Sequence, residues 1–515
     1  MTSKTADINR KSPKLLQNYI LALFLITTIH SSKSQSNISA SRPTPPPLPI
    51  LPIPTSHQLS WQLAEMALFF HFGPNTFTNS EWGTGHADPS VFDPDAVNAT
   101  QWVNVAKDAG FSRVILTTKH HDGFCLWPSQ YTDYSVRSSP WRNGTGDVVK
   151  ELAEAARANG VQLGLYLSPW DRHESCYGKT LEYNEYYLGQ MTELLTRYGE
   201  VKEVWLDGAK GEGEKYMEYF FDDWFNVIHQ LQAGAVIFSD AGPDVRWVGD
   251  EAGFSGTTCW SLFNQSNAKI GGTDPAYSGQ GDPLGHDWIP AECDPALALL
   301  DLYYKSVGRN CLLLLNVPPN SSGLIAQEDI LVLQEFTKMR TSIFSNNLAR
   351  VATVSASSTR GSINESLYSP VNILDESVDS YWAPASGPAS SSSSGWALYL
   401  DFDEAVEFNV VMVQEPIQMG QRIIEFRLDF VNGDGEWEVG ANGTTVGYKR
   451  LLVLFPSVNS RRLRFVVVKS RAEPLVSYFG LYTDPFSASG QVLGLRGNGS
   501  EVVPPRNRWI LKSSY

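Results

Sequence analysis

The sequence has few cysteines, and their spacing matches no metal site. The five cysteines are Cys125, Cys176, Cys259, Cys293 and Cys311. Five is an odd number, so at least one thiol is free or pairs between chains. Neither H-x-x-x-H nor C-x-x-C occurs, and the cysteine spacing fits no zinc motif. We therefore expect no metal and no cofactor.

Positive charge is also scarce. The chain has 40 Lys and Arg against 55 Asp and Glu, a net charge of −15. This balance argues against nucleic-acid binding, which requires cations that neutralise phosphates, and against binding to anionic membrane surfaces. A neutral sugar remains compatible. The 15 tryptophans could stack on pyranose rings, although indoles also fill large cores.

Long apolar runs are absent except at the N-terminus. The run 19–29 follows basic residues and precedes serines, and at roughly 11 residues it is too short to span a bilayer comfortably. We predict a secretory signal peptide over residues 1–35, with an uncleaved anchor as the alternative. We expect a secreted, extracellular protein, in the cell wall or apoplast if the chain comes from a plant.

N-x-S/T sequons support export and are predicted glycosylation sites. They lie at Asn37, Asn98, Asn143, Asn264, Asn320, Asn364, Asn442 and Asn498. Residues 36–56 are rich in proline, which predicts an extended linker. Residues 486–515 are interpreted as a C-terminal extension.

Strand-like and helix-like segments alternate over residues 57–348. The seven strand candidates are 66–72, 113–118, 161–168, 203–206, 235–239, 246–248 and 311–317. An eighth is less distinct, and Thr258–Leu262 is the best candidate. The pattern predicts an α/β fold with a (β/α)8-like (TIM) barrel. A doubly wound sheet would also alternate, but no Gly-rich phosphate loop follows a first strand.

Residues 349–485 have a different pattern, in which short β-rich runs are separated by turns. Examples are 397–402, 406–414, 423–430, 450–455 and 462–468. This pattern predicts an all-β sandwich or jelly roll after the barrel.

Polar residues follow several predicted barrel strands, where barrel enzymes place their active sites. They are His71, Lys119, His120, His121, Asp122, Ser168, Trp170, Asp207, Asp250 and Glu251. Two carboxylates can hydrolyse a glycoside, one as nucleophile and one as general acid and base.

Asp207 is the best nucleophile candidate, because Gly208 and Ala209 after it would leave room for a sugar. The alternative is an Asp that caps the next helix. Glu251 is the preferred partner and Asp250 its competitor, because neighbouring side chains of an extended segment point to opposite faces.

Adjacent histidines His120 and His121 would likewise point apart, so hydrogen bonds to sugar hydroxyls are favoured over a shared metal.

Five strings resemble the α-L-fucosidases of glycoside hydrolase family 29. They are HFGPNTFTNSEWGTG (71–85), TTKHHDGFCLW (117–127), LGLYLSPWDR (163–172), VWLDGA (204–209) and VRWVGDEAG (245–253). The resemblance runs in order from about His57 to Val317. The segments 351–359, 372–382 and 421–430 resemble discoidin-like modules, which accompany glycosidases as sugar-binding domains. A catalytic barrel followed by a discoidin-like module resembles the subgroup of this family that favours α-1,3/1,4 linkages, which includes the plant members.

The resemblance implies a retaining, metal-independent double displacement with Asp207 as nucleophile and Glu251 as acid/base. In that subgroup Asn often precedes the acid/base, and Asp250 stands there here. The substrate-binding residues that the resemblance implies are His71, Glu81, Trp82, His120, His121, Tyr166, Trp205, Arg246 and Trp288. Arg246 would steady the carboxylates, and Trp288 would line the pocket near the C6 methyl.

The partners implied are fucosylated oligosaccharides or glycoproteins, and the oligomeric state stays open. A mildly acidic pH optimum is expected, since the acid must be protonated when it first acts. The alternatives are a non-catalytic fucose-binding lectin, a glycosidase of another specificity, and an adhesion protein acting through its C-terminal module.

Overall fold

The computed structural model describes residues 44–211, 213–293, 299–361, 366–386 and 395–486. The predicted signal peptide, nearly all of the predicted C-terminal extension, and the sequons at Asn37, Asn364 and Asn498 lie outside these residues. No helix in the described ranges is long and apolar enough to cross a membrane.

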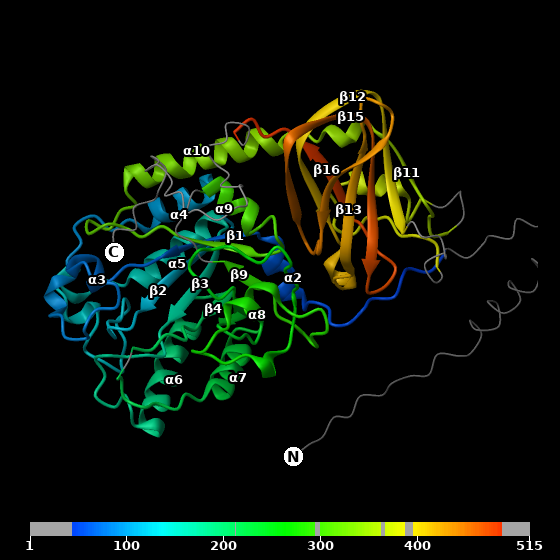
Figure 1. The fold of residues 1–515 in the computed structure, drawn as a ribbon. Helices are drawn as coiled ribbons and strands as arrows, with labels where there is room; N and C mark the ends of the chain where they lie inside the picture. The colour runs from blue at the N-terminus through cyan, green and yellow to red at the C-terminus, as the bar shows by residue number, and fades with distance from the viewer. Residues whose placement is uncertain (1–43, 212, 294–298, 362–365, 387–394, 487–515) are drawn as a thin grey trace, which may run out of the picture. The chain divides into compact units, whose positions relative to one another are not determined.

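Eight parallel strands close into a barrel, in the order β1-β2-β3-β4-β5-β6-β9-β10 (Figure 1). They are β1 (Met66–Phe70), β2 (Arg113–Lys119), β3 (Gln162–Leu167), β4 (Glu203–Trp205), β5 (Val236–Ser239), β6 (Val245–Trp247), β9 (Ala291–Cys293) and β10 (Leu312–Asn316). The predicted (β/α)8-like barrel is confirmed.

The eighth strand is not where the sequence suggested. Within the predicted Thr258–Leu262 only the last residue is in a strand, β7 (Leu262–Phe263), which pairs antiparallel with β8 (Asp287–Trp288) outside the barrel. The eighth barrel strand is β9, which is three residues long and carries a buried glutamate. Glu292 accepts a hydrogen bond from Trp205 Nε1, at 2.8 Å. Because this strand has only three residues and one of them is a glutamate, the sequence shows no apolar run there.

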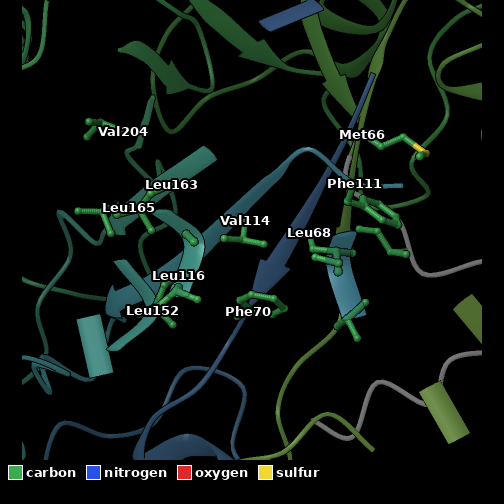
Figure 2. Packing of buried hydrophobic residues seen from close by; sticks show 14 of the residues in the cluster. Met66, Leu68, Phe70, Phe111, Val114, Leu116, Leu152, Leu163, Leu165 and Val204 are labelled. Atoms are coloured by element: carbon green, nitrogen blue, oxygen red, sulfur yellow. The ribbon is translucent and has the colours of Figure 1, made fainter. Parts of the chain in front are cut away.

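Alternate residues of the strands build two separate cores, as the pleat of a strand requires. Leu68, Phe70 and Val114 belong to the core between barrel and helices (Figure 2). Phe69 and Ile115, one residue along, lie in the smaller core inside the barrel. Because both faces of these strands are buried, their sequences are continuous apolar runs.

The helices of the barrel region are α2 (Ser56–Leu63), α3 (Pro74–Thr78), α4 (Ala99–Asp108), α5 (Val148–Asn159), α6 (Thr180–Arg197), α7 (Phe221–Leu231), α8 (Pro275–Gln280), α9 (Leu299–Lys305) and α10 (Gln327–Phe344). The sequence predicts helices over residues 97–110, 147–159, 183–198, 216–232 and 296–306, and α4, α5, α6, α7 and α9 lie close to these ranges. In α5 the Asp147 side chain accepts from Lys150 N, and Gly160 ends the helix at φ 68°. These caps direct the chain into β3.

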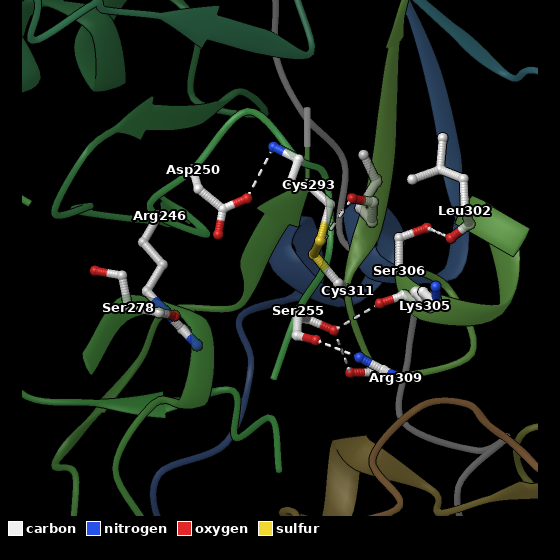
Figure 3. The surroundings of a disulfide bond; sticks show 12 residues. Arg246, Asp250, Ser255, Ser278, Cys293, Leu302, Lys305, Ser306, Arg309 and Cys311 are labelled. Atoms are coloured by element: carbon white, nitrogen blue, oxygen red, sulfur yellow. Dashed lines mark hydrogen bonds between the residues drawn. A yellow bond between two sulfur atoms is a disulfide. The ribbon is translucent and has the colours of Figure 1, made fainter. Parts of the chain in front are cut away.

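One disulfide joins Cys293, the last residue of β9, to Cys311, which directly precedes β10 (Figure 3). Cys125, Cys176 and Cys259 are free thiols. The covalent link therefore fastens the three-residue strand β9 to its neighbour on the barrel.

The C-terminal part is a six-stranded antiparallel sheet of β11 (Thr353–Ala356), β12 (Trp396–Gln414), β13 (Ile423–Val431), β14 (Trp437–Gly443), β15 (Arg450–Ser470) and β16 (Tyr478–Tyr482). The long strands β12 and β15 pair in three segments, which are separated by two register shifts. β11 pairs with the first half of β12, and β16 with the second half. The halves enclose a second apolar core that includes Leu398, Phe465 and Phe479. The predicted β domain is confirmed.

Residues 44–55 of the proline-rich segment form neither a helix nor a strand, and they are hydrogen-bonded to the C-terminal sheet domain. Arg360 Nε donates to the Pro45 carbonyl at 2.9 Å, and Arg422 Nη2 donates to the Leu48 carbonyl at 2.6 Å. Ile50 N donates to the Met419 carbonyl at 3.1 Å. The described part of this segment is therefore fixed along its length rather than acting as a free linker.

Candidate active site

Asp207 lies two residues beyond the end of β4, and both of its carboxylate oxygens have fixed partners. Oδ2 accepts a hydrogen bond from the Tyr166 hydroxyl at 2.9 Å, and Oδ1 accepts from Ala209 N at 2.7 Å. His121 Nε2 lies 3.5 Å from Oδ2. The side chain is 21% exposed, so it is held firmly but open to a ligand. It does not cap the next helix, which begins only at Phe221.

Three histidines cluster beside this carboxylate, from the ends of β1 and β2. The ring centroids of His71 and His120 are 5.5 Å apart, and those of His120 and His121 are 4.2 Å apart. His120 also stacks on Tyr166 at 5.7 Å. Burial lowers the pKa of all three histidines below 6.5. They are therefore neutral at pH 7, and each ring has one donor nitrogen and one acceptor nitrogen.

Hydrogen bonds fix which nitrogen carries the proton in two of these rings. The Ser168 hydroxyl donates to the Trp170 carbonyl, so it accepts from His121 Nδ1, at 2.7 Å. His71 Nδ1 donates to Asn316 Oδ1 at 3.1 Å. In both neutral rings Nε2 is then an acceptor. His120 Nδ1 is buried with no hydrogen-bond partner among the described residues, as expected of a group that binds a ligand.

Trp82 lies at the edge of this cluster and is 39% exposed. Its ring meets those of His121 and Trp170 edge-on, at 6.0 and 5.3 Å. The loop that carries it is held by Arg172, which donates to the Gly83 carbonyl, and by a 2.6 Å contact between His173 Nδ1 and the Gly85 carbonyl. Glu81, next to Trp82, is exposed.

Trp205 lies inside the barrel beneath these residues. It stacks on Phe238 at 3.9 Å and contacts Tyr166 at 5.3 Å, and its indole nitrogen bonds to Glu292. Only 8% of the residue is exposed. Trp205 thus supports Tyr166, which in turn holds Asp207.

Two expected substrate contacts need correction. The Arg246 guanidinium is buried and donates to the backbone carbonyls of Ser278, Trp260 and Ile289. Figure 3 shows Arg246 beside Ser278. It holds loops together instead of steadying the carboxylates. The Trp288 indole is buried and donates to Gln62 Oε1 at 2.9 Å, on helix α2. Helix α2 precedes β1, so Trp288 is directed away from the carboxyl ends of the strands.

The two adjacent carboxylates after β6 differ in their surroundings. Asp250 Oδ1 accepts from Ala252 N at 2.9 Å, which closes a local turn. Glu251 is exposed, and its carboxylate has no hydrogen-bond or ion-pair partner within the described ranges. Glu251 is therefore the freer of the two to meet a ligand.

Two residues of this region were missed, although the rule of looking at strand ends would have found them. Asn316, the last residue of β10, bonds to His71. Asp240 directly follows β5, is 9% exposed, and has its pKa raised by burial and then by the charge of Asp207. In the described part of the chain, no group of three or more His, Cys, Asp or Glu residues could hold a metal ion.

Asp122 directly follows His121 and is buried, and its Oδ2 has no hydrogen-bond partner among the described residues. Burial, with a contribution from Asp171, raises its pKa from 3.8 to about 7, while an amide hydrogen bond from Phe124 and the charge of Lys119 oppose the rise. An acid with a raised folded-state pKa is ionised less readily in the folded than in the unfolded chain. Its contribution to the free energy of unfolding therefore falls as pH rises from about 4 to about 7.

We expect Asp122→Asn to remove this pH dependence, because an amide does not ionise. Relative to the wild type, the variant should gain up to about 4 kcal/mol between pH 4 and pH 8, the equivalent of a pKa raised from 3.8 to about 7. Urea unfolding of both proteins across this range measures the gain. If the difference in free energy of unfolding between the two proteins does not change with pH, the pKa of Asp122 is not raised in the folded protein.

The chain is similar to known proteins over most of its length. The family model described as Alpha-L-fucosidase matches residues 58–339. Alpha-L-fucosidase 1 of Arabidopsis thaliana is 62% identical over 491 residues, covering 92% of this chain and 96% of that protein.

Solved structures match as well. The crystal structure of SpGH29 has a TM-score of 0.80 at 37% identity, covering 85% of this chain and 100% of that one. A Ruminococcus gnavus GH29 fucosidase in complex with fucose has a TM-score of 0.78 at 34% identity, covering 85% and 96%. The chain belongs to the α-L-fucosidase family, glycoside hydrolase family 29.

Proposed function

We propose that this enzyme hydrolyses terminal α-1,3- or α-1,4-linked L-fucose with retention of configuration. The observation that carries the proposal is the fixed, partly open carboxylate of Asp207 beside three neutral histidines. A nucleophile needs to be held in place, and a sugar needs neutral donors and acceptors for its hydroxyls.

The proposed reaction has two steps. Asp207 attacks the anomeric carbon while Glu251, in its acid form, protonates the departing glycosidic oxygen, which yields a covalent fucosyl ester. Glu251 then takes a proton from water, the water attacks the anomeric carbon, and Asp207 is released as a carboxylate. No metal is required for either step.

The neighbouring side chains suit a 6-deoxy sugar. His71, His120 and His121 offer hydrogen bonds to hydroxyls, and Tyr166 orients the nucleophile. Trp82 offers an apolar surface at the edge of the site. The Ruminococcus gnavus fucosidase described above was solved in complex with fucose, which supports fucose as the sugar that this site binds.

Linkage preference is tested by incubating the enzyme with α-1,2-, α-1,3-, α-1,4- and α-1,6-fucosylated oligosaccharides and measuring free fucose. We expect release from the α-1,3 and α-1,4 substrates and much slower release from the other two. Binding without release from any substrate would favour the lectin alternative. Equal release from all four would overturn the proposed linkage.

We also propose export and N-glycosylation, on the signal-like N-terminus and the sequons. Asn98, Asn143, Asn320 and Asn442 are exposed and suited to carry glycans. Asn264 is half-buried, and its amide nitrogen, where a glycan would attach, is already engaged with Asp282 Oδ2 at 2.7 Å. Peptide mapping after enzymatic deglycosylation of the secreted protein should find the first four sites modified and Asn264 unmodified.

A further inference from the structure

A third carboxyl group lies beside the proposed nucleophile. Asp240 follows β5, which is the barrel strand between β4 and β6. It is therefore placed between the strand end that carries Asp207 and the one that carries Glu251. The residue is buried, and neither of the proposed reaction steps uses it.

The carboxyl group of Asp240 packs directly against Gly208. A Cβ atom placed on Gly208 would lie 2.4 Å from Asp240 Oδ2 and 2.6 Å from both Cγ and Oδ1. The position after the nucleophile must therefore be glycine while Asp240 keeps this place. The sequence suggested that Gly208 leaves room for a sugar, but the carboxyl of Asp240 fills the space beside its Cα.

Asp240 also binds a loop that lies close to the nucleophile segment. Its Oδ2 accepts hydrogen bonds from Gly271 N at 2.9 Å and from the Thr273 hydroxyl at 3.2 Å. Gly271 in turn lies close to Gly208, because a Cβ on Gly271 would be 2.8 Å from the Gly208 carbonyl oxygen. The backbone just after Asp207 thus lies against both Asp240 and Gly271, which are bonded to each other.

We propose that Asp240 is a positioning residue for Asp207, which fixes the Asp207–Gly208 backbone by packing on Gly208 and by holding Gly271 and Thr273 in place. This inference rests on the proposed function, since it takes Asp207 as the nucleophile. Asp240 is poorly placed to be the acid/base itself, because it is 9% exposed and its Oδ2 already accepts two hydrogen bonds.

The first test compares Asp240→Ala with Asp240→Asn on an aryl α-L-fucoside. A nucleophile displaced by about 1 Å loses roughly 100-fold in rate. We expect Asp240→Ala to lower kcat by about that factor with KM nearly unchanged. Asn keeps an oxygen that accepts both hydrogen bonds, so Asp240→Asn should stay within about tenfold of wild-type kcat. Formate should partly restore kcat of Asp240→Ala by replacing the missing carboxylate.

If Asp240→Ala does not fold, Thr273→Val provides the second test. It removes one of the two donors, and kcat should fall several-fold at constant KM. The inference is overturned if a folded Asp240→Ala keeps wild-type kcat, if the loss is in KM alone, or if formate has no effect and Asn does no better than Ala. Thr273→Val with wild-type kcat would likewise overturn it if Asp240→Ala is unfolded.

The outcomes for Asp207 keep the two proposals separate. An active Asp207→Ala would overturn the proposed function itself. An inactive Asp207→Ala together with a fully active Asp240→Ala would overturn only the positioning role of Asp240.

Discussion

Asp207→Ala is expected to lower kcat/KM on fucosides by about 10,000-fold or more, the scale of effect seen when a catalytic nucleophile is removed. The other described carboxylates of the site are placed for different tasks: Asp240 packs against the backbone of Gly208, and Asp250 closes a turn with Ala252. When Asp207 is removed, neither of these carboxylates can therefore take its place beside the Tyr166 hydroxyl.

Steady-state kinetics on an aryl fucoside measures this loss, with circular dichroism and the melting temperature as controls for folding. Asp223→Ala is a matched control, since Asp223 is an exposed residue on helix α7, the next helix after Asp207. It should keep wild-type activity. Added azide should react in the space left by Asp207→Ala and yield a fucosyl azide of inverted configuration. A folded Asp207→Ala with more than a tenth of wild-type activity would contradict the assignment.

Glu251→Ala is expected to show the second largest effect, and its size should depend on the leaving group. General acid catalysis contributes about 100- to 10,000-fold. A fucosylated oligosaccharide has a poor leaving group that needs the proton, so kcat/KM should fall by that factor. An aryl fucoside whose phenol leaves as an anion should lose far less in kcat/KM. Azide should raise kcat on that substrate, because it replaces the water that Glu251 would activate.

Asp250→Asn distinguishes the two adjacent carboxylates. Its amide oxygen can still accept from Ala252 N, so the turn should persist. If Glu251 is the acid/base, Asp250→Asn should show little dependence on the leaving group. If Asp250→Asn instead shows the selective loss on oligosaccharides, and Glu251→Ala does not, the roles of these two residues must be exchanged.

Most of the barrel could be predicted from the sequence, because strands buried on both faces are continuous apolar runs. β9 escaped because it has three residues and contains Glu292, whose burial depends on a hydrogen bond from Trp205, a residue distant in the sequence. A pairing of that kind leaves no local pattern. Helix α10 was missed as well, although it spans 18 residues.

Only the site residues at or just after the ends of the barrel strands could be predicted from the sequence pattern. His71, His120, His121 and Asp207 gather because parallel strands end at the same edge of a barrel. Arg246 sits on a barrel strand too, but its side chain points to backbone carbonyls of the loops between residues 260 and 289. The direction of the Arg246 side chain depends on where those carbonyl oxygens lie, and the sequence of the strand does not contain that information.

The role of Gly208 likewise required the structure. In the sequence a glycine after the nucleophile indicates only that space is needed there. The structure shows that Asp240, 32 positions along the chain, occupies that space.

The most direct test of the account is to trap the covalent intermediate with a 2-deoxy-2-fluoro-L-fucosyl fluoride and to map the labelled peptide by mass spectrometry. The fluorine at C2 slows both steps, and the good leaving group lets the first proceed, so the ester accumulates. We predict inactivation in time, one fluorofucosyl group per chain, and the label on Asp207. A label on Asp240, Asp250 or Glu251, or turnover of natural substrate with no covalent adduct under any condition, would contradict the proposed mechanism.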